Sequence, residues 1–129
     1  MHIEHIAIWT NSLEQMREFY EIYFQARAGS KYRNLAKQFE SYFLDFSSGA
    51  RLELMTRPGI ADAINKNGEV FIGYSHLSFA CESEEIVDEL TDRLQKDGYR
   101  VVDGPRRTGD GYYESVVIDP DGNRIEITA

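Results

Sequence analysis

The amino-acid sequence predicts an α+β protein in which one βαβββ unit occurs twice. Two pairs of similar segments support this prediction: EHIAIW at 4–9 pairs with SHLSFA at 75–80, and GARLELMT at 49–56 pairs with GNRIEITA at 122–129. The pairs occur in the same order, with offsets of 71 and 73 residues. Matched segments at a nearly constant offset indicate a duplicated structural unit.

In the first half, residues 2–9 alternate between polar and apolar side chains, which is typical of a strand. Ser12 followed by Gln15 is a capping-box pattern, and it predicts a helix that continues to about Phe24. One face of this helix is expected to be buried, and its members are Leu13, Met16, Phe19, Tyr20, Tyr23 and Phe24. Three strands are expected next, near 26–33, 39–46 and 51–56, with a tight turn at Ser47, Ser48 and Gly49.

The second half repeats this pattern. The segment GYSHLSFAC predicts a strand, and a helix is expected from Ser83, with Glu84 and Glu85 in its first turn and Gly98 after its end. Its buried stripe is expected to contain Ile86, Val87, Leu90 and Leu94. Strands are then expected near 99–103, 112–118 and 124–128, the last two joined by a turn at Asp119, Pro120, Asp121, Gly122 and Asn123.

A chain of 129 residues has the size of one compact domain or of two very small ones, and one domain is the default. We therefore expect a single domain, residues 1–129, made of a module at 1–56, a connecting loop at 57–73 and a module at 74–129. Pro58 and several glycines favour a loop between the modules, with room for a short helical turn.

Composition excludes several classes of function. The formal net charge of -8 leaves no excess of cations for neutralising phosphates, so nucleic acid is not expected as a partner. No apolar run is long enough to cross a bilayer and no basic leader opens the chain, so no membrane association and a cytoplasmic location are expected. Cys81 is the single cysteine, so a bound metal would need nitrogen and oxygen ligands.

Strand alternation predicts that four polar side chains lie on sheet faces opposite the helices: His5, Glu53, His76 and Glu126. A single His or Glu on a strand is more often a hydrogen-bonded or solvated residue than a ligand. The matched placement of two His and two Glu favours a metal site instead, because halves folded face to face would bring all four side chains toward one axis.

The segments around these residues resemble the glyoxalase I and vicinal-oxygen-chelate superfamily, which includes bleomycin resistance proteins and dioxygenases. The resemblance covers nearly all of the chain and is carried by HIAIW with His5, RLELM with Glu53, YSHLSF with His76 and DPDGNRIEI with Glu126. It implies that the paired βαβββ modules form an open eight-stranded mixed-sheet barrel around a metal. It also implies that all four residues bind this metal, as in glyoxalase I and methylmalonyl-CoA epimerase, whereas the dioxygenase branch uses two His and one Glu.

The same resemblance implies a lactoylglutathione lyase-like enzyme of methylglyoxal detoxification. Such a lyase/isomerase converts the thiol hemithioacetal of a 2-oxoaldehyde to a 2-hydroxyacyl thioester through an enediolate. Glu126 is expected to be the base, with Glu53 as its pseudo-symmetric partner. Two imidazoles and two carboxylates suit a divalent ion, nickel or zinc first, with cobalt, manganese and iron also open. Such an ion stabilises negative charge on the substrate oxygens.

Three other functions stay open: an epimerase similar to methylmalonyl-CoA epimerase, an extradiol dioxygenase, and a metal-free protein that binds small-molecule drugs. The epimerase would use the same ligands, whereas the extra Glu53 counts against a dioxygenase and the intact ligand set against a metal-free protein. The expected partners are a small-molecule substrate, such as a thiol adduct, and a second copy of the chain, because two-fold homodimers are common. The metal site could lie within one chain or across the dimer interface.

Overall fold

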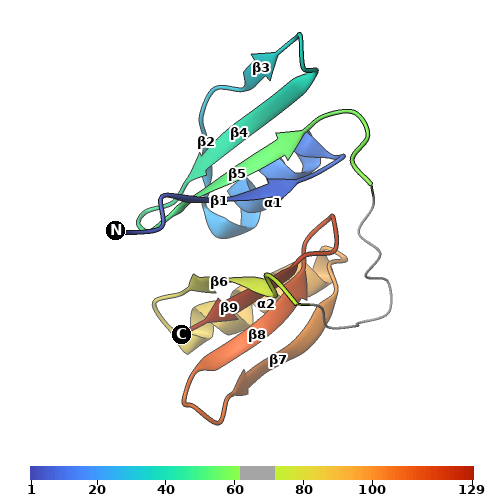
Figure 1. Ribbon diagram of the computed structural model, residues 1–129. Coiled ribbons are helices and arrows are strands. Elements are labelled where there is room, and N and C mark those ends of the chain that lie inside the picture. Colours follow the sequence, from blue (N-terminus) through green and yellow to red (C-terminus); the bar gives the residue numbers. More distant parts are fainter. Residues whose placement is uncertain (62–71) are drawn as a thin grey trace. The chain divides into compact units, whose positions relative to one another are not determined.

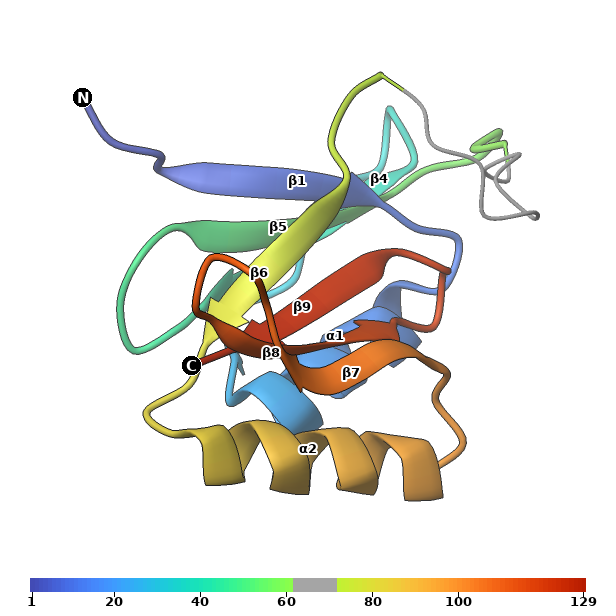
Figure 2. The same ribbon diagram turned by 90° about the horizontal axis from the view of Figure 1, so that it is seen from below.

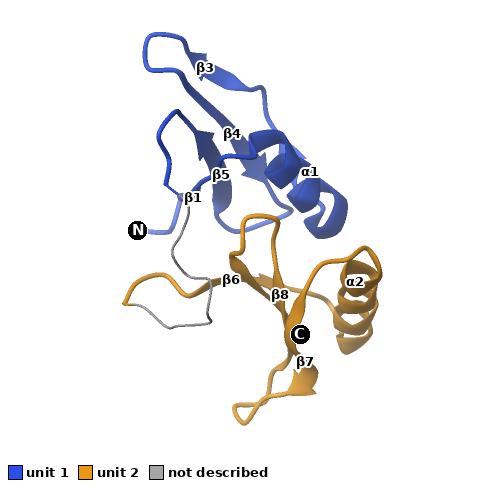
Figure 3. Ribbon diagram, turned by 90° about the vertical axis from the view of Figure 1, so that its right-hand side faces the viewer, with its two compact units in different colours: residues 1–66 blue, residues 67–129 orange. Residues whose placement is uncertain are grey.

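The computed structural model describes residues 1–61 and 72–129 and shows a chain rich in strands with two helices (Figure 1). The chain divides into two compact units, residues 1–66 and 67–129 (Figure 3). Residues 62–71 of the expected connecting loop, with any helical turn there, lie outside the described residues.

The described residues of unit 1 form one helix and a five-stranded mixed sheet. In chain order its elements are β1 (His5–Trp9), α1 (Leu13–Phe24), β2 (Arg27–Ala28), β3 (Tyr32–Asn34), β4 (Phe39–Asp45) and β5 (Arg51–Thr56). The strand order is β1-β5-β4-β2, and β3 also pairs with β4. Strand β1 runs parallel to β5, whereas the other pairs are antiparallel. The first strand of the unit therefore lies beside its last strand.

Unit 2 has the same arrangement with four strands. Its elements are β6 (His76–Ala80), α2 (Glu84–Lys96), β7 (Val101–Arg107), β8 (Tyr113–Ile118) and β9 (Arg124–Thr128). The strand order is β6-β9-β8-β7, with β6 parallel to β9 and the other pairs antiparallel. Helix α2 runs along one side of this sheet and contacts β7, β8 and β9 (Figure 2).

The predicted α+β class and the repeated unit are confirmed, since both sheets have the same mixed topology. The predicted number of strands is wrong by one. The described residues form nine strands in two sheets, and neither sheet closes on itself. The ninth strand arises because the expected strand at 26–33 is interrupted after Ala28, although the Gly29 amide still donates to the Phe43 carbonyl at 2.9 Å.

Helix α1 buries the apolar face that the sequence predicts. Its fully buried members are Leu13, Met16, Phe19 and Tyr20, whereas Tyr23 and Phe24 are half-buried. The helix contacts β5 and β4, whose buried side chains include Leu44, Leu52 and Leu54. Burial of each large apolar side chain contributes roughly 1.5–3 kcal/mol, so this layer holds the helix on one face of the sheet.

Helix α2 is rotated relative to the prediction. Val87 and Leu94 are buried as expected, but Ile86 is 39% exposed and Leu90 is only half-buried. The buried positions are spaced by four and three residues, which places Thr91 in the stripe and Ile86 about 100° away from it. The Thr91 hydroxyl donates to the Val87 carbonyl at 2.6 Å and lies 2.6 Å from the Ser115 hydroxyl, so this polar group is satisfied within the core.

The helix start predicted for α1 is correct, but the predicted capping hydrogen bond of Ser12 is wrong. Ser12 is the N-cap residue, but its side chain makes no capping hydrogen bond. The Ser12 amide instead donates to the Thr10 hydroxyl at 2.8 Å, and Thr10 itself is buried. The helix therefore begins where predicted. The backbone before it is held by the hydroxyl of Thr10 rather than by the side chain of Ser12. Gly98 follows α2 as predicted, in the left-handed conformation that favours glycine after a helix.

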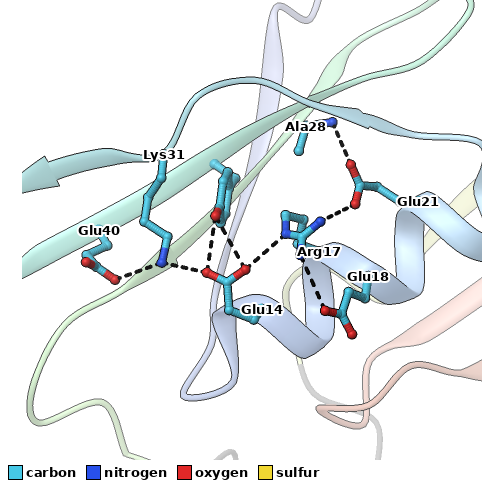
Figure 4. A network of polar contacts seen from close by, with 8 residues as sticks. Glu14, Arg17, Glu18, Glu21, Ala28, Lys31 and Glu40 are labelled. Carbon is cyan, nitrogen blue, oxygen red and sulfur yellow. Dashed lines mark hydrogen bonds and ion pairs between the residues drawn. The ribbon is translucent and has the colours of Figure 1, made fainter.

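Polar side chains tie α1 to the strands of unit 1 (Figure 4). Lys31 lies 2.5 Å from Glu14 and 3.3 Å from Glu40. Arg17 donates to Glu14 at 3.1 Å and also contacts Glu21, which accepts a hydrogen bond at 3.2 Å from the Ala28 amide. This network lies on the helix side of the sheet. Its side chains therefore do not cover the opposite face.

The predicted turn at 119–123 is confirmed and places β9 beside β8. The buried Asp119 carboxylate accepts hydrogen bonds from the amides of Asp121 at 3.0 Å and Asn123 at 2.8 Å, and from the Asn123 side chain at 2.8 Å. Gly122 has a φ of +93°, which only glycine adopts without strain. This turn fixes the start of the strand that carries Glu126.

Candidate metal centre

The first strand of each unit presents its histidine on the side away from the helix. In β1 the exposed His5 and Ala7 alternate with the half-buried Ile6 and Ile8, and β6 repeats the pattern from His76 to Ala80. Alternation along a strand means that His5 and His76 share a face with Ala7 and Ser78, respectively. We call this helix-free side the open face of each sheet.

The last strand of each unit places its glutamate on the same open face. Glu53 lies between the buried Leu52 and Leu54, whereas Glu126 lies between two buried isoleucines. The exposed fractions of the two carboxylate side chains are 14% and 19%, and those of the imidazoles of His5 and His76 are 41% and 42%. Each unit therefore exposes one imidazole beside one mostly buried carboxylate.

Parallel pairing sets the same relation between the two groups in each unit. Ala7 is opposite Glu53 in the β1–β5 pair, and Ser78 is opposite Glu126 in the β6–β9 pair. Each histidine therefore lies diagonally across from its glutamate. The His5 Nε2–Glu53 Oε2 distance is 3.9 Å, and the distance between the corresponding atoms of His76 and Glu126 is 3.5 Å. We call these the His–Glu pairs.

The surroundings of the imidazole differ between the units. In unit 1, the carboxylate of Glu4 contacts His5 Nδ1 and also the guanidinium of Arg51. These contacts, first with His5 and then with Arg51, hold the pKa of Glu4 below its usual value. The His5 ring also packs edge-on against Phe43, with 5.3 Å between ring centroids. A carboxylate on one ring nitrogen orients a histidine so that the other nitrogen is free to bind a metal.

The surroundings of the carboxylate also differ. In unit 2, the Ser78 hydroxyl donates to Glu126 Oε1 at 2.7 Å, while Oε2 is the atom that faces His76. In unit 1, Ala7 occupies the position opposite Glu53, and a methyl group donates no hydrogen bond. The two glutamates are therefore matched in position but differ in hydrogen bonding.

Besides Glu126, the open face of unit 2 carries a second carboxyl group, that of Glu114, which was not predicted from the sequence. Glu114 is opposite Thr128 in the β8–β9 pair, and the next pair on that face contains Glu126. Burial is the main cause that raises the pKa of Glu114. The nearby charge of Glu126 raises it further, whereas Arg106 lowers it. Alternation over 113–118 offers a signal for Glu114, but only the strand register shows that it lies near Glu126. The hydrogen bond of Ser78 to Glu126 was missed for the same reason, and the contact of Glu4 with the neighbouring His5 was also not predicted.

The donor atoms of each His–Glu pair fit a shared metal ion. Nitrogen and oxygen ligands that each lie about 2.0–2.2 Å from an ion are at most about 4.4 Å apart, and both pairs fall within this separation. Among residues 1–61 and 72–129, no group of three or more potential ligands lies together. The structure thus brings His5 to Glu53 and His76 to Glu126, and the convergence of the two pairs on one ion stays a prediction.

The remaining thiol adds little to this donor set. Burial raises the pKa of Cys81, which keeps the thiol protonated and weakens it as a ligand. The imidazoles and carboxylates of the His–Glu pairs are therefore stronger candidate ligands than this thiol. No helix within the described ranges is long and apolar enough to span a membrane.

Comparison with known proteins gives a consistent picture. The family model described as Glyoxalase/Bleomycin resistance protein/Dioxygenase superfamily matches residues 2–127. The uncharacterized protein YqjT of Bacillus subtilis is 39% identical over 61 residues, which are 45% of this chain and 48% of that protein, so the match spans about half of the curated relative.

Two solved structures extend the comparison to the fold. A structure of a possible glyoxalase from Bacillus cereus is 28% identical with a TM-score of 0.72, covering 100% of this chain and 99% of that one. The trypanothione-dependent glyoxalase I of Leishmania major is 22% identical with a TM-score of 0.76, covering 98% of this chain and 85% of that one. At this lower identity the second likeness shows the fold alone.

Proposed function

Because the chain belongs to the Glyoxalase/Bleomycin resistance protein/Dioxygenase superfamily, we propose that it is a metal-dependent lyase/isomerase of the glyoxalase I type. The observation that carries the proposal is the repeated His–Glu pair, with 3.9 Å and 3.5 Å between donor atoms in the two units. Four such donors, His5, Glu53, His76 and Glu126, would hold one divalent ion, with nickel or zinc as the first candidates.

The bound ion and Glu126 have different roles in the proposed reaction. A bound divalent ion supplies Lewis-acid stabilisation of negative charge on the substrate oxygens. Glu126 acts as the base: its carboxylate removes the proton from the carbon that bears the sulfur and the hydroxyl group of the hemithioacetal. The electron pair of the broken C–H bond forms a C=C bond and the electron pair of the adjacent carbonyl moves to its oxygen, which gives an enediolate. Return of that proton to the neighbouring carbon, with transfer of the hydroxyl proton from the first oxygen to the second, yields the 2-hydroxyacyl thioester. No atoms are gained or lost, so the reaction is an isomerisation of the adduct.

The environment of Glu126 suits this role. Its side chain is 19% exposed, so it is shielded from most of the solvent while one oxygen faces His76. Glu53 has a similar exposure and is proposed to act as the pseudo-symmetric ligand. We further propose that the chain forms one functional domain, works in the cytoplasm as a homodimer and acts on a small-molecule thiol adduct, such as that of methylglyoxal.

The test combines metal loading with one substitution. The purified protein is stripped of metal, reloaded with Ni²⁺ or Zn²⁺, and assayed with methylglyoxal and glutathione. We expect turnover only in the loaded protein. Glu126→Gln keeps the size of the side chain but removes the base, and kcat should fall by about 10²- to 10⁴-fold while the circular dichroism spectrum is unchanged. An unchanged kcat in this variant would remove Glu126 as the base.

A further inference from the structure

We infer that Ser78 is a positioning residue that orients Glu126 and makes it, of the two matched glutamates, the base. The inference rests on the proposed function. It follows from the 2.7 Å hydrogen bond from the Ser78 hydroxyl to Glu126 Oε1 in unit 2, which Ala7 at the matching position of unit 1 does not make.

The hydrogen bond assigns different partners to the two oxygens of Glu126. Oε1 accepts from Ser78, whereas Oε2 lies 3.5 Å from His76 Nε2. A carboxylate that is held at one oxygen loses rotational freedom about its last side-chain bond, so the second oxygen keeps a defined direction. Neighbours that fix a ligand or a base in this way change metal affinity or activity by about 10- to 100-fold when they are removed.

The strand register explains why Ser78 can do this. Ser78 lies directly opposite Glu126 in the parallel β6–β9 pair, and both side chains project from the open face. Residue 78 is exposed and lies away from the core, so its side chain is not needed for packing. Its hydroxyl can therefore hydrogen-bond the carboxylate of Glu126 without also contributing to the packing of the core.

Unit 1 provides an internal control for this contact. Ala7 stands opposite Glu53 in the same register, so the position that carries the Ser78 hydroxyl in unit 2 carries a methyl group in unit 1. A methyl group donates no hydrogen bond, so Ala7 does not hold an oxygen of Glu53 in the way that Ser78 holds Oε1 of Glu126.

The experiment compares Ser78→Ala with Ala7→Ser in the full-length, Ni²⁺-loaded protein, using the methylglyoxal–glutathione hemithioacetal. We expect Ser78→Ala to lower kcat by about 10- to 100-fold with KM within about threefold of wild type. Ser78→Thr, which keeps the hydroxyl, should retain most of the kcat. Ala7→Ser should stay within about threefold of wild type. Equal losses in Ser78→Ala and Ala7→Ser, or none in Ser78→Ala, would overturn the inference.

A second readout separates this inference from the proposed function. Crystal structures of the metal-free wild type and Ser78→Ala show the orientation of Glu126 without any assay. We expect a single orientation in the wild type and a rotated or multiple one in the variant. The same orientation in both proteins overturns the role of Ser78. A wild-type protein without turnover overturns the proposed function, and the two structures then still decide whether Ser78 orients Glu126.

Discussion

The open faces of the two units differ more than their backbones do. The open face of unit 1 carries aromatic rings: Phe39 packs edge-on against Trp9 and tilted against Tyr32, in both cases with 6.0 Å between ring centroids. Unit 2 places charged groups in the corresponding region, where Arg106 donates to Asp103 at 3.0 Å and lies opposite Glu114. Duplication has thus kept the topology and the His–Glu pair, while the neighbouring side chains diverged.

The units also stabilise different members of the pair. In unit 1 the imidazole of His5 is held by Glu4, which is itself held by Arg51. In unit 2 the carboxylate of Glu126 is held by Ser78. One unit therefore fixes a nitrogen donor and the other an oxygen donor.

The largest expected effect concerns the core that supports each pair. Leu54→Ala next to Glu53 and Ile127→Ala next to Glu126 each remove a fully buried side chain. Each substitution should lower the free energy of unfolding by about 2–5 kcal/mol, because it leaves a cavity under the strand. Urea unfolding followed by circular dichroism measures this loss. A change below about 1 kcal/mol in one variant would show that the two units do not depend equally on these layers.

A smaller effect sharpens the comparison of the two pairs. His5→Ala and His76→Ala each remove one ligand of the proposed site. If both pairs hold one ion, either substitution should weaken Ni²⁺ binding by more than about 100-fold, a larger loss than removal of an outer contact causes. Isothermal titration of the metal-free proteins with Ni²⁺ measures affinity and stoichiometry. Loss of only half of the bound metal in each variant would show two independent ions, one for each pair.

The smallest effect concerns the polar contacts behind the sheets. The Lys31 contact lowers the pKa of Glu14 below its ordinary value of 4.5, so its stabilisation is present above about pH 4.5 and is lost as the pH falls through the lowered pKa. Lys31→Met should therefore cost about 0.2–1 kcal/mol at pH 7, and the cost should vanish in acid. Urea unfolding at pH 7 and at a pH below the lowered pKa of Glu14 measures the difference in the free energy of unfolding.

A matched control for Lys31→Met comes from unit 2. Lys96 contacts Asp92 on the surface of α2, but its side chain is 74% exposed, compared with 19% for Lys31. Lys96→Met should therefore change the free energy of unfolding by less than Lys31→Met does. A cost for Lys31→Met that persists in acid would assign the contact of Lys31 to packing rather than to charge.

The repeated pattern predicted the fold well because hydrophobic periodicity is local. It placed His5, Glu53, His76 and Glu126 on strand faces opposite the helices, and the structure shows each pair within one unit. It missed the break after Ala28, because strand interruption depends on backbone pairing with β4. It misplaced Ile86 in the buried stripe, because small changes in helix rotation exchange Ile86 for Thr91.

The contacts that distinguish the two pairs could not be predicted for a related reason. Ser78 and Ala7 are small residues in alternating strands, and nothing in the local sequence marks one of them as a partner of a glutamate. Only the parallel register places Ser78 opposite Glu126, across 48 residues of chain. Pairing between distant strands is set by the whole sheet rather than by local sequence.

The central claim is that both His–Glu pairs bind one metal ion. The most direct measurement is a crystal structure of the Ni²⁺-loaded protein in its natural assembly. We expect one ion with nitrogen ligands from His5 and His76 and oxygen ligands from Glu53 and Glu126, from one chain or from two. An ion bound by a single pair, or no ion at either pair at saturating Ni²⁺, would contradict it.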